Sequence, residues 1–225
     1  EGFTYIAANP TLGIVTALAL ILFVFGFPYQ QVFVPLLATR TLDMGESGVG
    51  FLAGATGVGA FAGSLFVASR SNIARPGLQL MINMLIFGGA LVAISLQATL
   101  IGTAVLLAVA GSMTVTYMAF TNGILLEYST PEMHGRVMSL LSLDRGLIPI
   151  GAILSGMLVQ SLGVRPGLFV LGSTIMVLTA IVFVLWGKRI AEIRSGGMVA
   201  GHGRHAAEPE PPAGGPPLEA NPASG

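Results

Sequence analysis

The sequence predicts an all-α membrane protein with six transmembrane helices, and three observations support this fold class. Only 9% of the 225 residues are charged, whereas a soluble domain carries about 25%. The mean hydropathy is high, at +0.83. The charges also leave long gaps, with none at 2–39, 47–69, 76–126, 146–164 or 166–187. Charge-free segments of this length would leave a soluble fold almost no polar face for water, so a bilayer is the expected partner.

The gaps define the spans, because a helix needs roughly 20 apolar residues to cross the hydrocarbon core. The run 76–126 holds two helices, with residues 95–102 as the turn between them. We expect spans at about 11–37, 47–69, 77–95, 101–126, 138–162 and 167–187. Together with the segment up to 194 they form one transmembrane domain, preceded by an interfacial lead-in over residues 1–10. Residues 195–225 are rich in Gly, Pro and Ala, which predicts a disordered tail.

The distribution of Lys and Arg predicts the orientation. When the turns are numbered alternately, two of these residues, Arg40 and Arg165, fall on one side. The other side has six: Arg70, Arg75, Arg136, Lys188, Arg189 and Arg194. The positive-inside rule then places both ends of this chain in the cytoplasm. The net charge of zero gives no indication of a nucleic-acid partner, and the absence of cysteine excludes thiol chemistry.

A short internal repeat suggests two related halves. The tetrapeptide RPGL occurs at Arg75–Leu78 and again at Arg165–Leu168, each time at the start of the third span of a three-span group. Because three is odd, the second group would be inverted relative to the first. Inverted three-helix repeats are typical of secondary transporters.

Several polar side chains interrupt the apolar spans. Pro28 should kink the first span, and Tyr29, Gln30 and Gln31 follow it directly. Tyr117 and Asn122 lie in the fourth span. These five residues are candidates for a substrate cavity. For Tyr29, Gln30 and Gln31, hydrogen bonds between helices would account for the polar groups equally well.

Charged residues gather between the fourth and fifth spans. Asp144 lies six residues past Met138, roughly 9 Å into the fifth helix. Asp144 and the adjacent Arg145 are candidates for proton or ion coupling, with a structural ion-pair network as the alternative. The turn contributes Glu127, Glu132 and Arg136, which either cap helices and contact lipid headgroups or form a cytoplasmic gate.

The second span is rich in glycine. Gly50 and Gly54, and likewise Gly59 and Gly63, have the four-residue spacing that allows helix backbones to approach closely. We expect these glycines to pack against other helices rather than to bind a ligand.

Two segments, TPEMHGRVMSL (Thr130–Leu140) and DRGLIPIG (Asp144–Gly151), resemble the major facilitator superfamily. The most similar branch contains bacterial drug, macrolide and enterobactin exporters, whose turn of type P-[DE]-x-x-R-G-R-V has Arg where this chain has His134. The lead-in EGFTYIAANPTL is similar to the segment before that family's seventh helix. GSLFVASRSNIARPG (Gly63–Gly77) resembles a family loop motif but lacks its Asp.

The resemblance implies that the chain is the carboxyl-terminal six-helix half of a twelve-helix carrier. Its partners would be an amino-terminal six-helix half and a small amphipathic substrate of the drug or siderophore type. Spans one and four would line the central cavity, spans two and five the boundary between halves, and spans three and six the outside. Proton-coupled efflux by alternating access across a bacterial cytoplasmic membrane would follow, with no cofactor and no metal.

Two other functions compete with transport. An intramembrane protease needs a serine with a histidine base, but no histidine lies in any expected span, so we expect no enzyme. A non-transporting membrane scaffold, or a degenerate half-transporter, remains the alternative.

Overall fold

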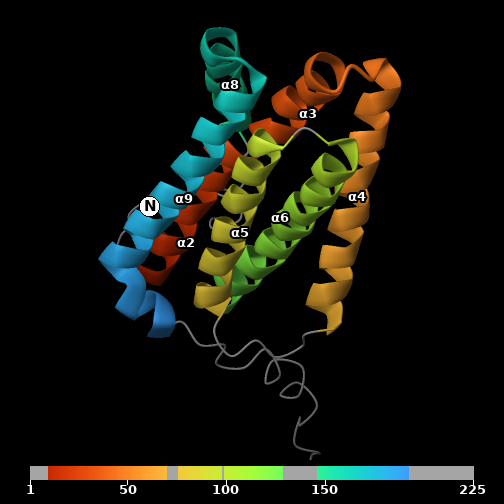
Figure 1. Ribbon diagram of the computed structural model, residues 1–225. Coiled ribbons are helices and arrows are strands. Elements are labelled where there is room, and N and C mark those ends of the chain that lie inside the picture. Colours follow the sequence, from red (N-terminus) through yellow and green to blue (C-terminus); the bar gives the residue numbers. More distant parts are fainter. Residues whose placement is uncertain (1–9, 70–75, 98, 129–145, 193–225) are drawn as a thin grey trace, which may run out of the picture. The chain divides into compact units, whose positions relative to one another are not determined.

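The computed structural model describes residues 10–69, 76–97, 99–128 and 146–192, and within them the chain is all helical (Figure 1). The first span combines α2 (Pro10–Ile21), η1 (Leu22–Gly26), η2 (Tyr29–Phe33), α3 (Val34–Leu36) and η3 (Leu37–Thr41). Five further helices follow, namely α4 (Gly45–Ser69), α5 (Pro76–Leu96), α6 (Leu100–Tyr128), α8 (Ile148–Leu162) and α9 (Val164–Glu192).

Five of these helical segments are long and apolar enough to cross a membrane: Gly13–Thr41, Gly45–Ser69, Pro76–Leu96, Leu100–Leu125 and Val164–Gly187. The predicted spans are confirmed there to within a few residues. The described part of the fifth predicted span is the 15-residue apolar helix α8, and the rest of that span, together with the lead-in before Pro10 and the tail, lies outside the described residues.

Helices α4 and α6 run parallel and touch through their backbones. A Cβ on Gly63 would lie 2.6 Å from the Ser112 carbonyl oxygen, and a Cβ on Gly59 would overlap the Ala108 carbonyl. From α6, a Cβ on Gly111 would overlap the Thr56 carbonyl. The prediction of close packing is therefore confirmed for Gly59 and Gly63.

The same prediction is wrong for Gly50 and Gly54 within the described chain. Both residues are exposed, and no described atom lies within 4 Å of a Cβ built on either one. The reason is that α4 presents only one face to α6, and these two glycines lie on the other.

Helices α5 and α9 run antiparallel and cross at a pair of glycines. A Cβ on Gly172 would lie 2.7 Å from the Gly88 oxygen and 3.0 Å from Val92 nitrogen. A Cβ on Gly88 would lie 2.7 Å from Cγ of Met176. These two contacts fix the antiparallel direction. The two RPGL copies thus stand at the starts of α5 and α9, two helices that run in opposite directions. Inversion of the whole three-helix groups stays a prediction.

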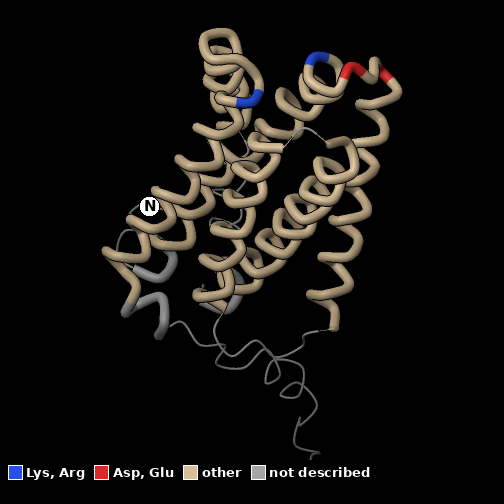
Figure 2. The backbone as a smooth tube through the Cα atoms, in the orientation of Figure 1, with Lys and Arg blue, Asp and Glu red and all other residues tan. Residues whose placement is uncertain are grey.

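The charged residues whose side chains the structure describes lie at one end of the helices (Figure 2). They are Arg40, Asp43, Glu46 and Arg165. The connections at this end are tight: Asp43 and Gly45 have φ values of 53° and 65°, and Gly163, with φ 94°, is the single residue between α8 and α9. Arg40 and Arg165 therefore lie on the same side, as their spacing predicts.

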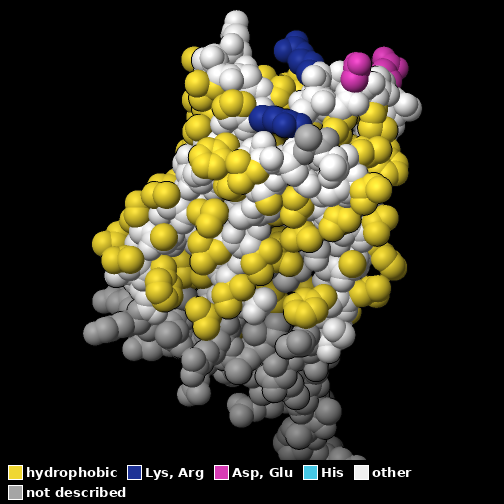
Figure 3. All heavy atoms as spheres, in the orientation of Figure 1, with side chains coloured by type: hydrophobic (Ala, Val, Ile, Leu, Met, Phe, Trp, Pro, Cys, Tyr) yellow, Lys and Arg dark blue, Asp and Glu magenta, His cyan; other side chains and the backbone are white. Residues whose placement is uncertain are grey.

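Among the described residues, the view in Figure 3 shows apolar side chains along the length of the helices and charged ones near that end. Large exposed apolar residues occur on every long helix, for example Phe61 on α4, Ile86 on α5, Val105 on α6 and Val184 on α9. A surface of this kind is suited to lipid tails rather than water.

Candidate functional site

Among the described spans, the first is the only one in which the backbone hydrogen bonds change from the i→i+4 pattern of an α-helix to the i→i+5 pattern of a π-helix. Pro28 supplies no N–H, and the π-helical segments η1 and η2 lie on either side of it. Phe27 N donates to the Leu22 oxygen at 2.8 Å, an i→i+5 bond. This interruption, predicted from Pro28, sets the directions of the polar residues that follow.

Tyr29 points into the protein. It is 2% exposed, and its ring meets Phe87 of α5 edge-on, with centroids 5.4 Å apart and planes at 75°. Its hydroxyl has the side chain of Thr114 on α6 as its hydrogen-bond partner. Tyr29 therefore connects the first span to α5 through an aromatic contact and to α6 through a hydrogen bond.

Gln30 and Gln31 point the other way and are both exposed. The middle of the span Gly13–Thr41 is Phe27, so the two amides lie only about 4.5–6 Å beyond the middle along the helix axis. The hydrocarbon core extends about 15 Å on each side of its midplane. Two exposed amides at this depth require hydrogen-bonding partners, because an unpaired buried amide costs about 1–3 kcal/mol even in proteins and more in hydrocarbon.

Tyr117 lies about 7 Å from the middle of its span and is 2% exposed. Its backbone takes part in a contact with Asn83, which is 1% exposed on α5. With the amide oriented to suit its neighbours, Asn83 donates to the Met113 oxygen at 3.2 Å and accepts from Tyr117 N at 3.3 Å. Asn83 thus joins α5 to the backbone of α6. Its position as a strongly polar residue in the interior of an apolar span could have signalled this role.

Asn122 is exposed, but it lies near the end of its span, where its amide does not need a partner within the protein. It lies about 14 Å from the middle of the span Leu100–Leu125. At that depth the headgroup region begins, so water or lipid headgroups can satisfy its amide. Of the five cavity candidates, Gln30 and Gln31 are therefore the two exposed polar residues deep in the membrane.

Along the sequence, the predicted coupling and gate residues fall in the last turn of α6 and between α6 and α8. Asp144, Arg145, Glu132 and Arg136 lie outside the described residues, as does the side chain of Glu127 in the last turn of α6. Their roles stay predictions.

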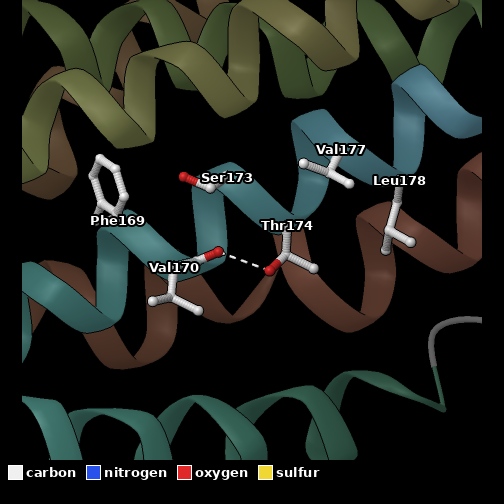
Figure 4. A pocket seen from close by; sticks show the side chains of 6 residues that line it. All are labelled: Phe169, Val170, Ser173, Thr174, Val177 and Leu178. Atoms are coloured by element: carbon white, nitrogen blue, oxygen red, sulfur yellow. Dashed lines mark hydrogen bonds between the residues drawn. The ribbon is translucent and has the colours of Figure 1, made fainter.

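Among the hollows on the surface of the described helices are two beside α9. One, of about 290 Å³, follows α9, where the hydroxyl of Thr174 donates to the Val170 oxygen at 2.8 Å (Figure 4). The other, of about 190 Å³, lies between α5 and α9 and is lined by apolar side chains and Thr179. Neither includes any of the five cavity candidates, and within the described residues no cluster of metal ligands occurs.

No family model, curated protein or solved structure matches this chain. Membership of the major facilitator superfamily accordingly stays a prediction. The length and composition of its helices identify the chain as a multi-pass helical membrane protein with five candidate spans.

Proposed function

We propose that this chain forms one wall of a secondary active transporter, rather than an enzyme. The supporting observation is the pair of exposed amides, Gln30 and Gln31, close to the middle of an otherwise apolar span. Polar groups at such depth are tolerated where they meet protein or line a water-filled cavity. In a transporter, an amide pair on a cavity wall can both donate to and accept from a small polar or amphipathic substrate.

The finer features of the proposal rest on the resemblance described above. They are proton-coupled efflux by alternating access, a substrate of the drug or siderophore type, a second six-helix half facing this one, and a bacterial cytoplasmic membrane with both ends of this chain inside. Asp144 and Arg145 would couple transport to protons. The described spans contribute the two exposed amides of the first span.

Water access to the amides is the direct test, and the absence of native cysteine makes it simple. Gln30→Cys and Gln31→Cys variants are reconstituted in sealed vesicles and treated with a water-soluble maleimide, which reacts with thiolate in contact with water. Ile86→Cys is the matched control, because Ile86 is 43% exposed at the middle of its own span. We expect the two glutamine positions to react at least tenfold faster than position 86.

Transport itself is measured on the full-length protein in vesicles with an imposed pH gradient, by efflux of a panel of lipophilic drugs and siderophores. Gln30→Leu should reduce efflux, whereas Ile86→Leu should not. Equal thiol reactivity at positions 30, 31 and 86, together with no gradient-driven efflux, would favour the non-transporting scaffold.

A further inference from the structure

The backbone of the first span is built differently from that of the other long helices. It has three π-helical segments, η1, η2 and η3, with i→i+5 bonds such as Leu42 N to the Leu37 oxygen at 2.9 Å. Pro28 and Pro35 remove two further backbone donors. In contrast, α4, α5, α6 and α9 are continuous α-helices of 21–29 residues. Bending is therefore easiest in the first span, since π-turns and prolines are recognised causes of helix kinks.

Helix α8 contacts the first span at the interruption itself. A Cβ on Gly151 would overlap the Val24 carbonyl and would lie 2.8 Å from Cγ of Pro28. The missing side chain lets the α8 backbone lie directly on the proline turn. Gly151 has no side chain that could interdigitate with the first span. The first span can therefore change its angle at this contact without separating packed side chains.

On its other side, the interruption is tied to two well-packed helices. Tyr29 reaches Phe87 of α5 and Thr114 of α6. The Thr114 hydroxyl itself donates to the Ala110 oxygen at 2.9 Å, so it presents a lone pair and the Tyr29 hydroxyl is the donor. Since α5 is packed backbone to backbone on α9, and α6 on α4, this hydrogen bond joins a bendable segment to a stiff one.

We propose that the first span bends between Leu22 and Phe33, with the contact at Gly151 as its pivot and the Tyr29–Thr114 hydrogen bond holding one of its two positions. Gln30 and Gln31 belong to the same segment and move with it. The proposal concerns the motion of this chain and stands whether or not the protein transports.

Distances between spin labels test the bend in the intact chain in lipid nanodiscs. One label replaces Thr39, which is exposed in η3, and the other replaces Leu96, which is 73% exposed at the end of α5. The reference pair is Leu96 with Val184, which is 81% exposed on α9, the helix packed on α5. We expect a broad or two-peaked distance distribution for positions 39 and 96, and a single narrow peak for positions 96 and 184.

Two substitutions test the hydrogen bond and the pivot separately. Tyr29→Phe removes the hydrogen bond and should change the ratio of the two populations about threefold, which is the typical effect of one hydrogen bond between membrane helices. Gly151→Ala adds a methyl group at the pivot and should leave one population, whereas Gly156→Ala, with nothing described within 4 Å of its Cβ, should leave both. A distribution for positions 39 and 96 as narrow as the reference, and unchanged by Tyr29→Phe, would overturn the proposal even if Gly151→Ala fails to fold.

Discussion

The backbone contact between α4 and α6 predicts opposite effects for alanine at neighbouring glycines. At Gly63 a Cβ would lie 2.6 Å from the Ser112 oxygen, 0.4 Å inside the 3.0 Å limit that real Cβ atoms respect. That oxygen belongs to a helix backbone, which cannot rotate away. At Gly59 the overlap with the Ala108 carbonyl is larger. Overpacking of a well-packed contact costs about 1–3 kcal/mol, so we expect Gly63→Ala to fall in the lower part of this range and Gly59→Ala at its upper end.

Gly57→Ala is the matched control in the same helix, because nothing described lies within 4 Å of its Cβ. There the substitution should be neutral or stabilising by up to about 1 kcal/mol, which is the difference in helix propensity between the two residues. The free energy of unfolding is measured by titrating mixed micelles with SDS and following the circular dichroism. Equal stability of the Gly59→Ala and Gly57→Ala proteins would refute the assignment of a backbone contact to α4 and α6.

Three further predictions follow from the polar residues. A double-mutant cycle of Tyr29→Phe and Thr114→Val in the same SDS titration should give a coupling of about 0.6 kcal/mol and at most about 1.7 kcal/mol, whereas additive effects would mean that the two hydroxyls do not interact. Asn83→Leu should destabilise the protein by about 1–2 kcal/mol because both partners on α6 lose their contact; a more stable variant would contradict this role. Cysteines at Arg40 and Arg165 should react with an impermeant maleimide from the same side of sealed vesicles, and labelling from opposite sides would contradict the arrangement in Figure 2.

Helix ends were predictable because charge and hydropathy change abruptly there. The expected span 77–95 corresponds to α5, Pro76–Leu96, and the expected span 47–69 to α4, Gly45–Ser69. The position of a helix end depends on whether each residue meets lipid or water, and the hydropathy and charge of the sequence follow that change directly.

Contacts between helices were less predictable, because they depend on neighbours that one segment does not specify. The pairs Gly50/Gly54 and Gly59/Gly63 have identical spacing, yet only the second touches another described helix. Spacing defines a smooth stripe on a helix but does not say whether a partner lies against it.

The direction of adjacent polar side chains was likewise undetermined. Tyr29 is buried and Gln30 is exposed, although both follow Pro28 in an almost uniformly apolar stretch that has no clear polar face. The i→i+5 bonding that rotates these residues depends on tertiary packing. From the sequence, only the interruption at Pro28 itself was visible.

The tight turn at Gly163 has a practical consequence. One residue with φ 94° joins α8 to α9, so this hairpin has no extended stretch that could enter the active site of a protease. An epitope tag inserted there would first have to unwind one of the two helices. Limited digestion should therefore spare this connection, and reporters of topology belong elsewhere in the chain.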